Sequence, residues 1–230
     1  STNLRQLKAF FFNLCGFGVP HEPKLQTNPV LARSGKARQF SNMCGRYTLH
    51  LSPLQLAEAM DLPAPDTYRP DYNIAPGGEI LSRTTDSLEF MHWGVRTPQN
   101  FHINARLETA DATPRFRDAW LDHRCLIPAN GFYEWLNDGI RKQPYYLFPE
   151  NKQLLYLAGL WFPQSEETSL PQCVLLTAGA SESVEEIHSR MPVAISLNRL
   201  DDWLNLRLTK AEAQDCARTV PYKKYTVSSR

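Results

Sequence analysis

A succession of short, apolar, β-type segments is the feature of this sequence that most restricts its fold. Segments such as LEFMHWGV (88–95), LLYLAGLWF (154–162) and QCVLLTAGA (172–180) are rich in residues favoured in strands. The helical patterns among them are short, for example TPRFRDAWL (113–121). Because strands and helices do not alternate regularly as in βαβ units, the sequence predicts an α+β fold.

Local sequence signals indicate where some of these helices and strands begin and end. Ser52 followed by Pro53 is typical of a capped helix start and predicts a helix over SPLQLAEAMDL. The run RCLIPANGFYEWL (124–136) is a single long strand candidate, and SESVEEIH (181–188) suits a short helix.

The first 43 residues differ from the rest of the chain. They carry six basic residues and one acidic residue, a net charge of +5, whereas residues 44–230 carry 19 basic and 23 acidic residues, a net charge of −4. They are also rich in Pro, Gly and polar residues. We expect residues 1–43 to be an irregular basic arm (a leader, a misassigned translation start or an expression scar) and residues 44–230 to be a single domain.

The cysteines and the hydropathy pattern exclude several classes of protein. The sequence has five widely spaced cysteines and no Cys/His pair at a zinc-ligand spacing, which argues against a disulfide framework or a metal site and favours a reducing compartment. No apolar run approaches the roughly 20 residues of a membrane span. Cys125, Cys173 and Cys216 lie in apolar patterns and are expected to be buried thiols.

The pair Met43-Cys44 gives the most specific chemical signal. A small residue after methionine is what removal of that methionine requires, so Cys44 would carry a free amine if translation began at Met43. The ordinary pKa values of an α-amine and a thiol are about 7.7–8.0 and about 8.5, so both are usable nucleophiles near neutral pH. Together they condense with an aldehyde to a Schiff base and then to a thiazolidine. An internal Cys44 would instead be a small buried apolar residue.

Three other segments contain the residue types that such chemistry needs. In HINARLET, Asn104 offers an amide and Arg106 a planar cation suited to a phosphate or a carboxylate. In NGFYEWL, Glu134 stands between aromatic neighbours, where the pKa of the carboxyl is expected to rise and the group to act as a general acid or base. EIHSRMPV combines His188, a proton-transfer group, with the cation of Arg190. Each residue alone is more often structural than catalytic.

The order of the short motifs resembles that of one protein family. MCGRY, YNIAPG, HWG, INARLET, RCLIPANGFYEW, LLTAGA and IHSRMPV follow one another as in the SRAP (SOS-response-associated peptidase) family. The resemblance runs from Met43 to about Val193 and continues more loosely beyond it. It implies a mixed or antiparallel, β-rich SRAP-like fold with several short peripheral helices, and an activity in which abasic DNA sites are shielded by cross-linking to the protein.

The resemblance also implies roles for individual residues. Cys44 matches the cysteine that cross-links to the ring-opened aldehyde of an abasic site. Glu134 and His188 match residues that transfer protons, and Asn104 matches one that orients the amine and the intermediate. The remaining matches hold phosphates or line the DNA-binding surface: Arg46, Asn73, Pro76, Arg106 and Arg190. Phe101 and His102 are expected to replace in part the tryptophans that a longer connection carries in the family.

These expectations define a first hypothesis for function. The protein would act on single-stranded DNA containing abasic sites, forming a thiazolidine through N-terminal Cys44 once residues 1–43 are absent. Self-cleavage before Cys44 would free the amine. No cofactor, metal ion or membrane is implied, and the protein would be a monomer in the cytoplasm of a bacterium or the nucleus of a eukaryote.

Two alternatives stay open. The first is a cysteine peptidase or hydrolase that uses the Cys44 thiolate with His188 and Asn104, and needs no free amine. The second is a module that binds damaged single-stranded DNA by shape and charge without a covalent step.

Overall fold

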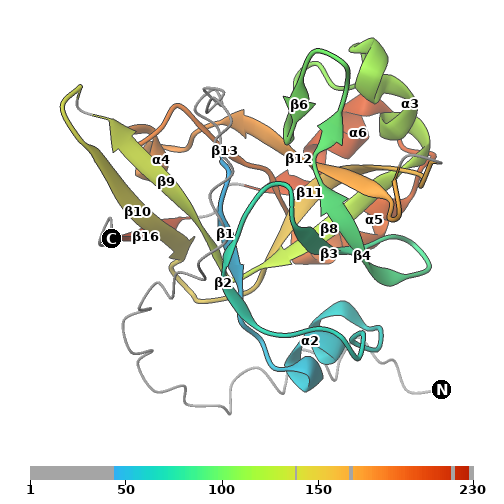
Figure 1. Cartoon of the computed structure of the whole chain (residues 1–230), viewed down its shortest axis with the longest axis horizontal. Helices are drawn as coiled ribbons and strands as arrows, with labels where there is room; N and C mark the ends of the chain where they lie inside the picture. The colour runs from blue at the N-terminus through green and yellow to red at the C-terminus, as the bar shows by residue number, and fades with distance from the viewer. Residues whose placement is uncertain (1–43, 138, 166–167, 219–220, 228–230) are drawn as a thin grey trace. The chain divides into compact units, whose positions relative to one another are not determined.

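The structure, a computed structural model, describes residues 44–137, 139–165, 168–218 and 221–227. Two β-sheets and a small hairpin make up most of this part of the chain, and short helices lie around them (Figure 1). The fold is α+β and rich in β-structure, as the sequence predicts. The expected arm, residues 1–43, lies outside the described residues. Within the described ranges no helix combines the length and apolar character that crossing a membrane requires.

The smaller sheet has five described strands, all antiparallel to their neighbours. In sequence order they are β1 (Tyr47–Leu49), β2 (Asp71–Ile74), β9 (Gly131–Asn137), β10 (Lys142–Pro149) and β16 (Tyr222–Thr226). Their order in space is β16-β10-β9-β1-β2. Tyr47 pairs with Phe132 on one side and with Ile74 on the other, so β1, the first strand of the described chain, lies between two other strands of this sheet.

The larger sheet is mixed, and β12 is its central connection. Its described strands are β3 (Glu79–Arg83), β4 (Leu88–Trp93), β7 (Asn104–Arg106), β8 (Arg124–Ala129), β11 (Leu155–Phe162), β12 (Gln172–Gly179), β13 (Arg190–Pro192), β14 (Ala194–Ile195) and β15 (Ala217–Arg218). Strand β12 pairs antiparallel with β11 and β13 and parallel with β4 and β7. Thr177 of β12 pairs with Arg106 of β7 and with Pro192 of β13, so β7 and β13 flank the same strand.

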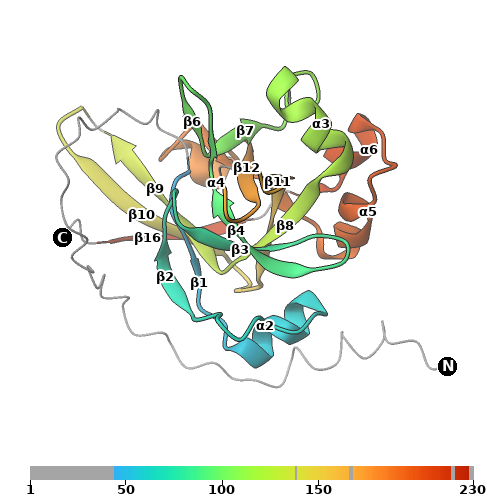
Figure 2. The same ribbon diagram turned by 45° about the vertical axis from the view of Figure 1, so that its right-hand side comes forward.

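A short hairpin, β5 (Val95–Arg96) and β6 (Phe101–His102), joins β4 to β7. It starts at Gly94, whose φ of +120° suits glycine, and a Cβ there would lie 2.2 Å from the Phe101 ring. The hairpin lies near helix α3 (Pro114–Asp122) in Figure 2. His102 hydrogen-bonds to Arg115 and packs edge-on against Phe116 of that helix. The β6 end of the hairpin is therefore anchored to α3.

The helices are short, and local sequence explains where they begin. Besides α3 they are α2 (Pro53–Met60), α4 (Glu182–Glu185), the 3₁₀ turn η1 (Leu197–Arg199), α5 (Leu200–Leu204) and α6 (Lys210–Asp215). The predicted start of α2 is confirmed: Ser52 accepts a hydrogen bond from the backbone of Gln55, whose side chain accepts one from the Ser52 N–H. Helix α4 ends earlier than predicted, before His188.

The run RCLIPANGFYEWL, predicted as one strand, divides between the two sheets. At Asn130 the chain leaves the larger sheet, and the Asn130 side chain accepts a hydrogen bond from the His50 N–H at 2.7 Å. At Gly131 a Cβ would lie 2.5 Å from the Leu147 carbonyl oxygen, so only glycine allows this close approach to β10. The division carries Glu134 into the smaller sheet, two strands away from β2.

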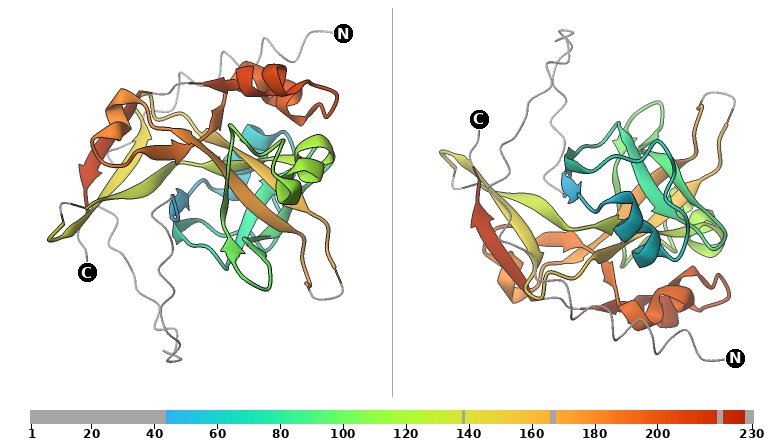
Figure 3. Two further views of the ribbon diagram at one scale, coloured as in Figure 1. Left: turned by 90° about the horizontal axis from the view of Figure 1, so that it is seen from above. Right: turned by 90° about the horizontal axis from the view of Figure 1, so that it is seen from below.

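Arg124, at the start of β8, is 2% exposed and holds two helix ends. Its guanidinium donates to the carbonyl of Trp120 in α3 at 2.9 Å, and to the carbonyls of Trp203 and Asn205 at the end of α5 at 2.8 and 2.5 Å. These carbonyls have no partner within their own helices, because they belong to the last turns. Views from above and below show α5 and α6 side by side next to the larger sheet (Figure 3).

The internal cysteines are buried thiols, as predicted. Cys125, Cys173 and Cys216 are each free and 0% exposed. The Sγ atoms of Cys125 and Cys173 lie 3.7 Å apart on β8 and β12, with β11 between these strands.

Candidate functional site

Cys44 lies just before β1 and connects the two sheets. Its side chain is 1% exposed. Its backbone carbonyl accepts a hydrogen bond from Nδ2 of Asn104 at 3.0 Å. Asn104 begins β7 and is itself buried, held in register by pairing with Leu175 of β12. The predicted nucleophile and the predicted orienting amide, far apart in the sequence, are therefore in direct contact.

Glu134 reaches Cys44 from the other side. The pairing of β1 with β9 continues to the hydrogen bond from the Tyr133 N–H to the Arg46 carbonyl, at 2.9 Å, which brings β9 alongside the residues that precede β1. Glu134 is 3% exposed, and its carboxyl lies close enough to the Cys44 thiol for each group to shift the pKa of the other. Cys44, Asn104 and Glu134 thus form one buried cluster.

Burial determines the protonation of this cluster. It raises the pKa of Glu134 to about 8, although hydrogen bonds from the Trp135 N–H and the Cys44 thiol partly oppose the rise. Burial also raises the pKa of the Cys44 thiol well above its ordinary value, and the negative charge of Glu134 adds to this effect. At neutral pH most Glu134 side chains therefore carry a proton, so the first reaction open to this group is to donate it.

The raised pKa of Glu134 was predicted, but for the wrong structural reason. Successive side chains in a strand point to opposite faces, so Tyr133 and Trp135 lie on the other face of β9 from Glu134. Tyr133 instead packs against Tyr146, with ring centroids 5.1 Å apart, and donates its hydroxyl to the Tyr72 carbonyl. Glu134 is desolvated because it lies against Cys44, not because the aromatic neighbours in its sequence enclose it.

Two acceptor atoms of the cluster are open for a ligand group. Among the described residues, the buried Oε1 of Glu134 and Oδ1 of Asn104 have no hydrogen-bond partner. A buried acceptor without a partner costs on the order of 1–3 kcal/mol, so such atoms are uncommon in folded proteins. Both belong to residues that contact Cys44. A polar group that binds beside Cys44 would satisfy them.

His188 lies in the turn between α4 and β13, and its ring is held by Arg190. Nδ1 is 2.9 Å from the Arg190 carbonyl oxygen and 3.1 Å from the Arg190 backbone nitrogen. In the part of the chain that is described, no hydrogen bond joins the ring to Cys44, Asn104 or Glu134. His188 belongs to the segment that enters the larger sheet beside β12, on the side opposite β7.

Three of the residues predicted to face DNA lie at the β1–β2 edge of the smaller sheet. Arg46 donates from Nη1 to Oδ1 of Asn73 at 2.6 Å, linking β1 to β2. Pro76 is half-buried in the turn that follows β2. This turn is fixed to β4 by the hydrogen bond from the Gly77 N–H to the Trp93 carbonyl, at 2.8 Å.

The other two predicted arginines differ from each other in their surroundings. Arg106 of β7 is exposed. The guanidinium of Arg190 binds both carboxylate oxygens of Glu108, at 2.7 and 2.9 Å, and donates to the Thr177 carbonyl at 2.5 Å. The charge of Arg190 is therefore already matched by a carboxylate within the protein, and its role in holding a phosphate stays a prediction.

Glu108 was not singled out from the sequence. It follows Arg106 by two residues in INARLET, a spacing that places two side chains on one face of an extended chain. That spacing could have marked it as a charged neighbour of the site. Its partner, however, lies 82 residues further along, and no local pattern indicates it.

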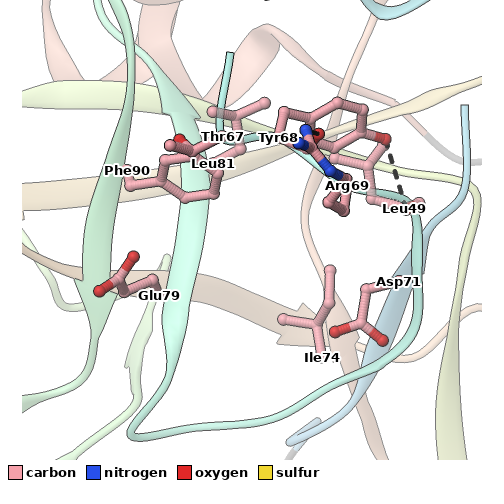
Figure 4. A pocket seen from close by; sticks show the side chains of 9 residues that line it. All are labelled: Leu49, Thr67, Tyr68, Arg69, Asp71, Ile74, Glu79, Leu81 and Phe90. Atoms are coloured by element: carbon pink, nitrogen blue, oxygen red, sulfur yellow. Dashed lines mark hydrogen bonds between the residues drawn. The ribbon is translucent and has the colours of Figure 1, made fainter. Parts of the chain in front are cut away.

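A separate open pocket of about 230 Å³ lies between the β2 region and strands β3 and β4 (Figure 4). Its lining includes the apolar side chains of Ile74, Leu81 and Phe90 and the carboxylates of Asp71 and Glu79. None of the nine predicted site residues lines it. The Cys44 cluster and this pocket are distinct features of the molecule.

Comparison with known proteins gives consistent matches. The family model described as "SOS response associated peptidase (SRAP)" matches residues 43–230. The abasic site processing protein YoqW of Bacillus subtilis is 34% identical over 185 residues, covering 73% of this chain and 82% of YoqW. YoaM of the same species, also an abasic site processing protein, is 32% identical over 187 residues, covering 74% and 82%. The abasic site processing protein HMCES of Gallus gallus is 31% identical over 183 residues, covering 60% and 54%.

Solved structures share the fold. A phage-related protein from Bordetella bronchiseptica aligns with a TM-score of 0.66 and 27% identity, over 80% of this chain and 94% of that one. A protein from Bacteroides thetaiotaomicron aligns with a TM-score of 0.72 over 81% of this chain and 93% of that one. Its 20% identity supports the fold alone.

Proposed function

Because the chain belongs to the SOS response associated peptidase (SRAP) family, we propose that it processes abasic sites in DNA, the activity for which its relatives YoaM and YoqW are named. Cys44 would form a covalent thiazolidine with the aldehyde of an abasic site in single-stranded DNA. The main support is the buried cluster of Cys44, Asn104 and Glu134, in which a carboxyl with a pKa of about 8 touches the thiol.

The chemistry requires a proton donor and then a proton acceptor at the same place. The amine of Cys44 adds to the aldehyde carbon, and loss of one water gives the imine. Protonated Glu134 is suited to donate the proton that this water needs to leave, because its raised pKa keeps it protonated at neutral pH. The resulting carboxylate, adjacent to Cys44, can then take the thiol proton as sulfur adds to the imine carbon and nitrogen gains a proton. The net change is the loss of one water.

Asn104 would assist by holding Cys44 in place, and His188 would assist at the earlier step in which the sugar ring opens. Asn104 holds the Cys44 carbonyl, which limits the rotation of the residue that carries both nucleophiles. His188 would exchange the proton that opens the closed sugar to its aldehyde form, with Nε2 as the free ring nitrogen. Arg46, Asn73, Pro76 and Arg106 would contact the DNA strand around the lesion.

The proposed reaction needs a free Cys44 amine. While Met43 is joined to Cys44, that nitrogen belongs to an amide and cannot form an imine. Hydrolysis of the Met43–Cys44 bond, or synthesis from Met43 followed by methionine removal, would release it. We propose that one of these events precedes cross-linking, and that Glu134 supplies the proton transfer if the protein cleaves itself.

Mass spectrometry tests the proposal directly. The full chain and a chain started at Met43 are each incubated with a single-stranded oligonucleotide that carries one abasic site, and are then denatured. The chain with Cys44 as its first residue should gain the oligonucleotide mass less one water. Cys44→Ala should bind the oligonucleotide and gain no mass. A freed, folded wild-type protein that stays unmodified would contradict the proposal.

The two alternatives have their own outcomes in this experiment. A cysteine hydrolase would turn over a peptide or ester and form no DNA adduct, but the raised pKa of the Cys44 thiol leaves little thiolate for that reaction at neutral pH. A non-covalent DNA-binding module would bind the oligonucleotide in a salt-dependent way and release it on denaturation.

A further inference from the structure

Glu108 holds the side chain of Arg190, and the backbone of Arg190 holds the imidazole ring of His188. The guanidinium binds Glu108 with both carboxylate oxygens and also contacts the carbonyl and hydroxyl of Thr177. Only 17% of the Arg190 side chain is exposed. Bidentate pairs of this kind fix the orientation of both partners, because two parallel hydrogen bonds allow little rotation.

The carboxylate side of this clamp is itself fixed. The Glu108 carbonyl accepts a hydrogen bond from Lys210 of α6 at 3.2 Å, and the neighbouring Leu107 donates to the Thr177 carbonyl at 2.9 Å. The hydrogen bond with Arg190 lowers the pKa of Glu108, which keeps the carboxylate ionised. Glu108 is therefore a charged anchor on a braced segment.

The clamp reaches His188 through the Arg190 backbone. The Arg190 carbonyl and N–H both lie near Nδ1 of the His188 ring, at 2.9 and 3.1 Å. When Nδ1 carries a proton, it donates to the carbonyl; when it carries none, it accepts from the N–H. In either state Nδ1 keeps a partner, and Nε2 remains the nitrogen that exchanges protons with a ligand. The position of this backbone determines how the ring is held.

We propose that Glu108 is a positioning residue for His188: its bidentate clamp on the Arg190 guanidinium fixes the Arg190 backbone that holds the imidazole by Nδ1. The catalytic part of this inference rests on the proposed function, in which His188 transfers a proton. The structural part does not, because it concerns the orientation and tautomer of one ring. Glu108 would contact neither DNA nor Cys44.

A rival explanation of the same contact predicts the opposite behaviour. If Glu108 only occupied Arg190 until a phosphate replaced it, Glu108→Gln would free a cation for DNA. DNA affinity would then rise, and the His188 ring would be unchanged. A positioning role predicts an altered ring and an unchanged affinity.

The first test uses the full chain without DNA. Long-range ¹⁵N–¹H spectra report which nitrogen of a histidine ring carries the proton, and His188→Ala identifies the signals of this ring. Glu108→Gln should change the tautomer ratio of His188, and Glu108→Asp, which keeps the charge but shortens the side chain, should change it in the same direction. The matched control is Asp118→Asn, which breaks the exposed ion pair with Arg117. Unchanged His188 signals in both Glu108 variants would overturn the proposal.

The second test measures cross-linking at saturating abasic oligonucleotide, with protein that has Cys44 as its first residue. Glu108→Gln should lower the rate about tenfold, since a small loss of alignment has effects of this order, and should leave Kd unchanged. Added to His188→Ala, it should have no further effect, because it acts through that ring. An equal loss in the His188→Ala background would overturn the proposal. If folded wild-type protein with a free Cys44 amine forms no adduct, the proposed function fails, and the spectra still decide the role of Glu108.

Discussion

The thiol of Cys44 and the carboxyl of Glu134 lie next to each other in a space where their residues are only 1% and 3% exposed. Burial raises the pKa of both groups, and the negative charge of Glu134 adds to the rise at the Cys44 thiol, so at neutral pH the thiol and most Glu134 carboxyls hold their protons. The pair is supplied by two different segments that the β1–β9 pairing brings together. Proton transfer at this pair is therefore where substitutions should have their clearest effects.

Glu134→Gln should slow adduct formation by about 100-fold, a typical contribution of a general acid or base. The wild-type rate should rise with pH as the amine loses its proton and fall again through about pH 8 as Glu134 loses its own. In the variant the descending limb near pH 8 should disappear. Quenched time courses on denaturing gels from pH 6 to 9 measure this. Glu58→Gln, on the exposed side of α2, is the control, and a descending limb that persists in Glu134→Gln would contradict the assignment.

The same substitution should change how stability depends on pH. The pKa of Glu134 is raised from its ordinary 4.5 to about 8, so the folded protein binds this proton more tightly than the unfolded chain does. Its stabilising contribution is complete below pH 4.5 and is lost as the pH rises through about 8. The Tm of Glu134→Gln minus the Tm of wild type should therefore increase from pH 5 to pH 8. Calorimetry at both values tests this, and a constant difference in Tm would count against the raised pKa.

Asn104→Ala should weaken both the fold and the reaction. The Cys44 carbonyl would lose its donor in a buried place, at a cost on the order of 1–3 kcal/mol in the free energy of unfolding. The rate of adduct formation should fall about tenfold, because the residue carrying both nucleophiles is less well held. Urea denaturation and the cross-linking assay measure the two effects. Asn104→Asp keeps the size but removes the donor, so a wild-type rate in that variant would rule out the orienting role.

Arg46→Ala should weaken binding to single-stranded DNA without regard to base sequence. If Arg46 contacts a phosphate, its loss should reduce the slope of log Kd against log salt by about one. Binding by fluorescence anisotropy at several salt concentrations measures the slope. Arg69→Ala is a matched control, since Arg69 donates to backbone carbonyls of its own loop. An unchanged slope in Arg46→Ala would show that the Arg46–Asn73 contact is structural.

Arg124→Met should destabilise the fold without altering the chemistry of the site. The methionine fills a similar space but leaves the buried carbonyls of Trp120 and Trp203 without this donor, while the Asn205 carbonyl keeps the Leu208 N–H as its donor. The loss should be about 3 kcal/mol, since two buried acceptors lose their donor. Thermal unfolding measures it. A variant as stable as wild type would show that these two helix ends do not depend on Arg124.

The sequence predicted a helix start correctly where that start depends on residues that are neighbours in the sequence. The start of α2 depends on Ser52, Pro53 and Gln55, which are neighbours in the sequence, and the structure confirms it. The break at Asn130 was not predicted, because it depends on a hydrogen bond from His50, far earlier in the chain. The strand over Asn104 was also missed, since its stability comes from parallel pairing with β12.

The chemistry of the site followed from residue types, but its assembly did not. An amine with a thiol, a carboxyl and an imidazole were recognisable as chemical groups in the sequence. The contact between Cys44 and Asn104 spans 60 residues, so only the resemblance to a family implied that these two residues lie together. The Glu108–Arg190 pair spans 82 residues and had no such guide.

The concealment of Cys44 has a consequence for selectivity. Reactivity toward common electrophiles and oxidants depends on an accessible thiolate, and here the sulfur is covered and protonated. Glutathione disulfide or a haloacetamide should therefore modify this residue slowly. This arrangement favours an aldehyde that binds beside Cys44 over small electrophiles and oxidants that need an exposed thiolate.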